Sequence, residues 1–186
     1  SILVKGGGLD LKGNLSFKND GGIKKVSINR LVFGGTNIRA IMAPKPTNLK
    51  GGWDIDISGK SIDLIEWLAT DEEQNTTERL GMYTLSLNID KAEIYDGEKL
   101  ENVNGVLSFD GLVWTNINLE ARLDGAKKLK VVLIPKEGKR YLNVESNDAG
   151  SLLKVFDYYD NLIGGKFALR GEYNGMSPDS EFAGHV

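Results

Sequence analysis

The chain has 186 residues, of which 40% are hydrophobic and 26% charged, and this composition is typical of one large or two small folded domains. The formal net charge of −3 provides no basic surface for nucleic acid, and the absence of cysteine excludes disulfides and thiolate chemistry. His185 is the single histidine, so a metal site built from histidine and cysteine is excluded, and we expect neither a metal nor a cofactor.

Segments of alternating apolar and polar residues predict β-strands along most of the chain. In chain order they cover residues 9–17, 23–33, 38–42, 53–57, 83–94, 103–109, 112–123, 129–134, 142–144, 166–173 and 181–186. Many of the turns between them contain asparagine, aspartate and glycine, as in Asn19-Asp20-Gly21-Gly22 and Asp124-Gly125. Strands of period two joined by short turns predict an antiparallel meander, in which the last strand has no visible partner.

A strand, a polar break and a short helix follow one another at two places. In Arg140–Asp160 the break is Ser146-Asn147-Asp148, and we expect a helix near 148–157 because the Asp148 carboxylate can accept the free amide hydrogens of its first turn. In Trp53–Ala69 the break is Ser58-Gly59-Lys60-Ser61, which predicts a helix near 61–69.

Two pairs of similar segments indicate an internal repeat. Gly13–Phe17 (GNLSF) is similar to Gly105–Phe109 (GVLSF). The strands before the two predicted helices are also similar, with Ile55 and Ile57 corresponding to Leu142 and Val144. We therefore divide the chain into a first β-repeat at 1–70, a polar connector at 71–80 and a second β-repeat at 81–186. The second repeat is expected to be truncated at its C-terminal end, and the chain to be part of a longer array.

The predicted fold is mainly β: a curved antiparallel sheet with an open groove, built of two strand-rich repeats with one short α-helix each. A helix of about ten residues spans only roughly 15 Å, so two of them cannot cover the apolar face of such a sheet. The uncovered face needs another sheet, a protein partner or a lipid. A groove could shelter acyl chains at about 0.8 kcal/mol per buried CH₂ group.

The candidate groove residues are the apolar members of the strands with the clearest alternation. They are Ile38, Ala40, Met42, Tyr83, Leu85, Leu87, Ile89, Ile117, Leu119, Ala121, Leu129, Val131 and Leu133. Parity alone does not decide which face of the sheet is concave.

Three further interpretations compete with lipid binding. The run Gly59-Lys60-Ser61 is similar to the end of a phosphate-binding loop, but Asp54 stands where that motif requires glycine, so a helix cap is favoured. Asp54 and Asp56 are alternate residues that could serve as acid and base in a glycan hydrolase, although no third polar group accompanies them. A structural or assembly module, with its apolar face covered by a protein partner, is the main alternative.

A resemblance to a known family rests on several short runs. They are Leu100–Gly105, Leu107 with Asp110-Gly111, Leu119–Leu123, Ser146–Leu153, Gly164–Phe167 and, in the first repeat, Gly59–Leu64. Together these runs resemble the AsmA-like proteins and, more narrowly, their YhdP-type branch. The resemblance covers nearly the whole chain, and its most specific part is Asp148-Ala149-Gly150.

This resemblance implies a non-enzymatic protein of the bacterial envelope, involved in outer membrane biogenesis. It implies a periplasmic location, with an inner-membrane anchor and other membrane contacts in parts of the protein absent from this chain. By analogy with bridge-like lipid transfer proteins, the expected partners are phospholipid acyl chains and further repeats of the same chain. The expected activity is phospholipid transport between the inner and outer membranes.

Overall fold

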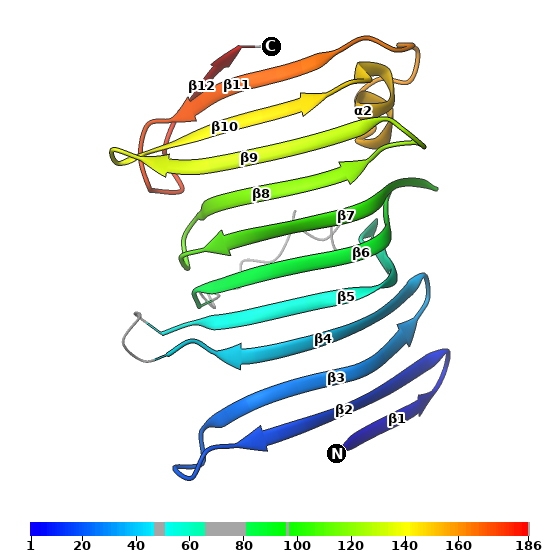
Figure 1. Cartoon of the computed structure of the whole chain (residues 1–186), viewed down its shortest axis with the longest axis vertical. Coiled ribbons are helices and arrows are strands. Elements are labelled where there is room, and N and C mark those ends of the chain that lie inside the picture. Colours follow the sequence, from blue (N-terminus) through cyan, green and yellow to red (C-terminus); the bar gives the residue numbers. More distant parts are fainter. Residues whose placement is uncertain (47–50, 66–80, 96, 186) are drawn as a thin grey trace.

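The computed structural model describes residues 1–46, 51–65, 81–95 and 97–185, and it contains one open, curved sheet of twelve strands (Figure 1). The strands lie side by side in chain order from β1 to β12. They are β1 Ile2–Gly6, β2 Leu9–Phe17, β3 Ile23–Phe33, β4 Thr36–Pro44, β5 Trp53–Asp63, β6 Tyr83–Tyr95, β7 Glu98–Phe109, β8 Trp114–Arg122, β9 Lys128–Lys136, β10 Lys139–Ser146, β11 Phe167–Tyr173 and β12 Phe182–His185. The predicted mainly β fold with an open sheet is therefore confirmed.

The sheet is mixed, whereas the sequence predicted an antiparallel one. β5 pairs with β6 in parallel, Trp53 lying opposite Tyr83 and Asp63 opposite Glu93, and every other neighbouring pair of strands is antiparallel. A parallel pair requires the chain to cross back to the starting end of the strand before it pairs again. Alternation of apolar and polar residues is the same in both kinds of pair, so the pattern could not reveal this crossing.

The predicted break at Ser58–Ser61 and the beginning of the first predicted helix are wrong. These residues belong to the interior of β5, which continues to Asp63 and pairs with β4 on one side and β6 on the other. Two long neighbouring strands thus override a local sequence that favours a turn. Residues 66–69 of the predicted helix and the predicted connector at 71–80 lie outside the described residues.

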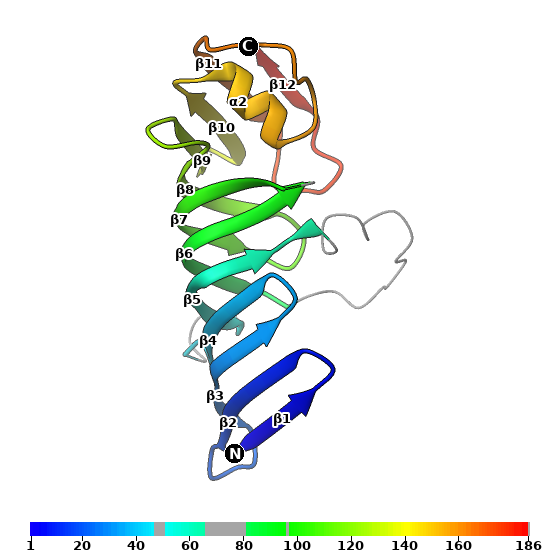
Figure 2. The same cartoon turned by 90° about the vertical axis from the view of Figure 1, so that its right-hand side faces the viewer.

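The second predicted helix is confirmed as α2, Ala149–Val155. Asp148 is its N-cap, and the backbone N–H of Ser151 donates to Asp148 Oδ1 over 2.7 Å. The first turn is also held by the following loop, because the N–H groups of Ala149 and Gly150 donate to the carbonyls of Gly165 and Gly164. Figures 1 and 2 place α2 at one end of the strands, against a single face of the sheet.

The N-cap makes the stability of α2 dependent on pH. Hydrogen bonding from the Ser151 backbone, helped by Lys127, holds the pKa of Asp148 below its ordinary value of 3.8. A lowered pKa in the folded state adds stability above about pH 3.8, which is lost as the pH falls through the folded pKa. Asp148→Ala should lower the melting temperature by about 2–4 °C at pH 7, and the difference from wild type should shrink in acid.

Thermal unfolding followed by circular dichroism between pH 2 and 7 measures this difference. Asp124→Ala is the matched control, because Asp124 also lies beside Lys127 but caps no helix. It should lower the melting temperature by less than Asp148→Ala does. An Asp148→Ala deficit that stays constant down to pH 2 would contradict the role of the ionised cap.

The last strand has a partner, contrary to the prediction. β12 pairs with β11 in antiparallel fashion, with Arg170 opposite His185 and Tyr173 opposite Phe182. The similar pentapeptides of the sequence occupy the ends of β2 and β7, and the similar strands before the predicted helices are β5 and β10. Similar segments thus lie five strands apart within one continuous sheet.

Candidate functional site: the apolar face of the sheet

All thirteen candidate groove residues lie on the same face of the sheet, which we call the apolar face. The register fixes this result, because residues directly opposite each other on paired strands point to the same side. One row across the strands is Ile28, Ala40, Ile57, Leu87, Gly105, Leu119, Val131, Val144 and Leu169. A second row is Val26, Met42, Ile55, Leu85, Leu107, Ile117, Leu133 and Leu142. The apolar face is therefore one continuous strip from β3 to β11.

The opposite face of the sheet is largely polar. Its members include Arg39, Ser58, Asn88, Asn104 and Glu120, which occupy the alternate positions of the same strands. The apolar side chains of β3–β11 are therefore concentrated on one side of the sheet.

The two aspartates considered as acid and base lie on this polar face. Both are exposed, and Asp54 Oδ1 is 3.8 Å from Lys45 Nζ. His185 lies in β12, also on the polar face, opposite Arg170. The structure thus brings no candidate catalytic group onto the apolar face.

Glycines on the apolar face show the direction in which the sheet bends. A Cβ atom built on Gly105 would lie 2.7 Å from the Asn118 carbonyl oxygen, and one built on Gly13 would lie 2.8 Å from the Ser27 carbonyl oxygen. In both cases the backbone of the next strand rises above the apolar side of the glycine. β-Bulges lie beside these contacts, and bulges with glycines are the usual means of bending a sheet. The apolar face is therefore the inner side of these bends.

Burial divides the candidate residues into two groups. Ile38, Ala40, Ile89, Ala121, Leu129 and Leu133 are buried, whereas Met42, Tyr83, Leu85, Leu87, Ile117, Leu119 and Val131 are half-buried. Four of the buried six share a hydrophobic cluster with Leu152 and Val155 of α2. Part of the predicted groove is thus internal core, and the half-buried residues form the accessible part of the strip.

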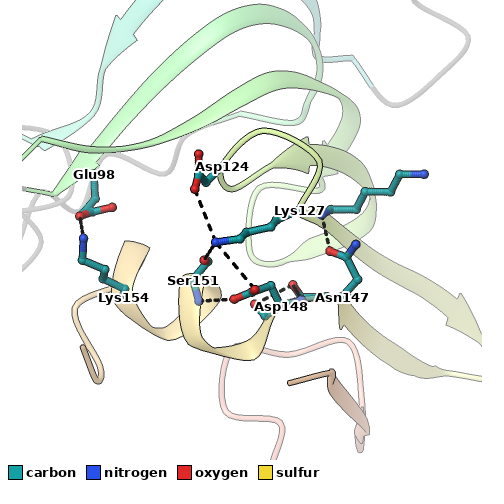
Figure 3. Close-up of polar contacts among 9 residues, drawn as sticks. Glu98, Asp124, Lys127, Asn147, Asp148, Ser151 and Lys154 are labelled. Atoms are coloured by element: carbon teal, nitrogen blue, oxygen red, sulfur yellow. Dashed lines mark hydrogen bonds and ion pairs between the residues drawn. The ribbon is translucent and has the colours of Figure 1, made fainter. Parts of the chain in front are cut away.

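Ion pairs and hydrogen bonds fix α2 over its end of the apolar face (Figure 3). Lys127 Nζ lies 2.9 Å from Ser151 Oγ, 3.5 Å from Asp124 Oδ2 and 3.8 Å from Asp148 Oδ2. Lys154 pairs with Glu98 of β7, and this pairing raises the pKa of the lysine. We call these contacts the α2 clamp. Sequence reasoning missed it because nothing in the sequence pairs the loop at 124–127 or β7 with the helix.

Aromatic side chains mark the other end of the strands. Tyr83, Phe109 and Trp114 form a cluster with ring centroids 5.3–5.7 Å apart, and burial raises the pKa of the Tyr83 phenol. Trp53 lies opposite Tyr83 on β5, and the rings of Tyr173 and Phe182 are 4.9 Å apart. We call these six residues the aromatic rim. Only Tyr83 was predicted as a site residue, since the register that aligns the six becomes visible only in the structure.

Arg140 is a buried cation within the aromatic rim, with 5% of its surface exposed. Its guanidinium lies 4.5 Å from the centre of the Tyr173 ring and donates to the carbonyls of Trp114, Gly175 and Ser177. No carboxylate of the described residues forms an ion pair with it. Arg140 therefore ties the loop after β11 to the rim and leaves a positive charge there.

The described part of the chain contains no cluster of histidine, aspartate and glutamate that could hold a metal ion. None of its helices has both the length and the apolar character that crossing a membrane requires. No family model, curated protein or solved structure matches the chain.

Proposed function

We propose that this chain is a non-enzymatic lipid-binding segment of a bridge-like protein, which carries phospholipids between the inner and outer membranes along a hydrophobic groove. The observation that carries the proposal is the register, which aligns apolar side chains on the inner side of an open, bent sheet. The proposed location is the periplasm, and the proposed full-length protein is anchored in the inner membrane. The resemblance to the YhdP-type branch of the AsmA-like proteins supports both statements.

The dimensions of the strip suit a conduit for acyl chains. At about 4.8 Å between neighbouring strands, the strip from β3 to β11 spans roughly 40 Å across the sheet. Each CH₂ group that leaves water on this surface contributes about 0.8 kcal/mol to the free energy of binding. The two rows of the apolar face contain no polar or charged side chain that an acyl chain would have to pass. A lipid could therefore move from strand to strand with little change in free energy.

Photocrosslinking from paired positions on β8 tests the proposal. Leu119 is half-buried on the apolar face, whereas its neighbour Asn118 is exposed on the polar face. A photoreactive amino acid at Leu119 should crosslink to phospholipid, and the same group at Asn118 should not. Native mass spectrometry of the unmodified chain should show bound phospholipid. Equal crosslinking from both positions, or no lipid by either method, would overturn the proposal.

A structural or assembly module is the second candidate, and the apolar residues near the N-terminal edge favour it. Ile2 and Val4 of β1 are each 44% exposed, and Phe17 of β2 is 57% exposed. Covering them would stabilise an assembly through the hydrophobic effect. Size-exclusion chromatography with light scattering separates the two functions: a stable, lipid-free oligomer favours the module, and a lipid-loaded monomer favours transport.

A further inference from the structure

The two ends of the strands differ in how far the apolar face is covered: α2 covers it at one end of β7–β9, and at the other end β6–β8 carry half-buried rings, while Leu133 of β9 is buried. Over β7–β9 the α2 clamp holds Leu152 and Val155 on the strand ends that carry Val103, Ala121 and Leu129, and all five of these residues are buried. At the other end the rings of Tyr83, Phe109 and Trp114 are only half-buried. A lipid that lies on this part of the sheet can therefore keep its polar group in water at the end with the half-buried rings, but not at the end covered by α2.

The aromatic rim has the chemistry of a boundary between hydrocarbon and water. Tyrosine and tryptophan combine an apolar ring with a polar group, and both are enriched where lipid tails meet headgroups. Arg140 adds a cation that is paired with no carboxylate of the described residues. The charge of Arg140 would attract a phosphate that lies near this end of the strands.

We propose that phospholipids lie along the strands β6–β9, with their headgroups at the aromatic rim and their acyl chains directed toward α2. This proposal rests on the proposed function and adds an orientation to it. The length of the strand fits an acyl chain, because the seven residues from Tyr83 to Ile89 on β6 extend over roughly 20 Å. The hydrocarbon layer of one leaflet of a bilayer is about 15 Å thick, so an acyl chain fits between the rim and α2.

Two phospholipid probes test this orientation on the unmodified chain. One probe carries a diazirine in its headgroup and the other carries it near the end of an acyl chain, and the modified residues are mapped by peptide mass spectrometry. The headgroup probe should label Trp53, Tyr83, Phe109 or Trp114 at least fivefold more than Ile62 and Leu64, which lie at the other strand end. The acyl-chain probe should label the middle of the strip, including Leu87 and Leu119.

The outcomes separate this orientation from the proposed function. Labelling of the apolar face by the acyl-chain probe, with headgroup labels near Ile62 or spread evenly over both strand ends, overturns the orientation and leaves lipid binding standing. Absence of acyl-chain labels from the apolar face overturns lipid binding and the orientation with it.

Discussion

Replacing Leu119 with glutamate is expected to lower the amount of bound phospholipid at least about tenfold. Leu119 lies in the middle of the apolar face, separated from Leu87 by Gly105, so a carboxylate there would lie among the acyl chains. Burying an ionised carboxylate against hydrocarbon without a partner costs several kcal/mol, and each 1.4 kcal/mol is a factor of about ten in affinity. Native mass spectrometry and thin-layer chromatography of extracted lipid measure the loss.

Asn118→Glu is the matched control for this substitution. It adds the same charge one residue away, on the polar face, and it should change neither the bound lipid nor the melting temperature appreciably. Because Leu119 is only half-buried, the glutamate variant should keep the far-ultraviolet circular dichroism of the wild type. Leu87→Glu repeats the test on β6. If both folded variants retained the wild-type amount of lipid, the binding surface would have to lie elsewhere.

The sequence was sufficient to predict most of the strands and the division of their residues between two faces, but it did not predict β1 or the second half of β5. A side chain on a strand points to the opposite side from its neighbour, so alternation such as that of Tyr83–Ile89 contains the face assignment directly. The strands then only have to pair in consistent register for the thirteen candidates to share one face. The helix α2 was equally predictable, because a cap such as Asp148 and the residues that it caps are neighbours in the chain.

Features that depend on contacts between distant residues could not be predicted. The aromatic rim unites residues of β5–β8, β11 and β12, and the buried position of Arg140 depends on the loop after β11. The burial of Ala121 and Leu129 depends on where α2 lies, and the α2 clamp between distant residues fixes that position. The parallel pairing of β5 with β6 could not be predicted either, because apolar and polar residues alternate in the same way in parallel and antiparallel pairs.

The run Ser58-Gly59-Lys60-Ser61 shows how a local signal can mislead. Glycine and serine together favour a turn, and a helical spacing of apolar residues follows them in the sequence. In the structure Gly59 is needed inside a strand for a different reason: a Cβ atom there would meet the Asn37 carbonyl oxygen and lie 2.7 Å from the Cα of Ile38. A glycine that permits close approach of two backbones looks the same in the sequence as one that permits a turn.

Gly59→Val is therefore expected to destabilise the sheet by about 3 kcal/mol or more, since the clash is with backbone atoms of β4 and cannot be relieved by a side-chain rotation. For a chain of this size such a loss lowers the melting temperature by about 6–12 °C. Gly81→Val is the matched control: a Cβ atom there meets nothing within 4 Å, and the melting temperature should change by no more than about 2 °C. Thermal unfolding followed by circular dichroism compares the two. Equal melting temperatures of the two variants would mean that β4 and β5 do not approach closely at Gly59. The inference that the sheet bends toward its apolar face would then have no support at this position.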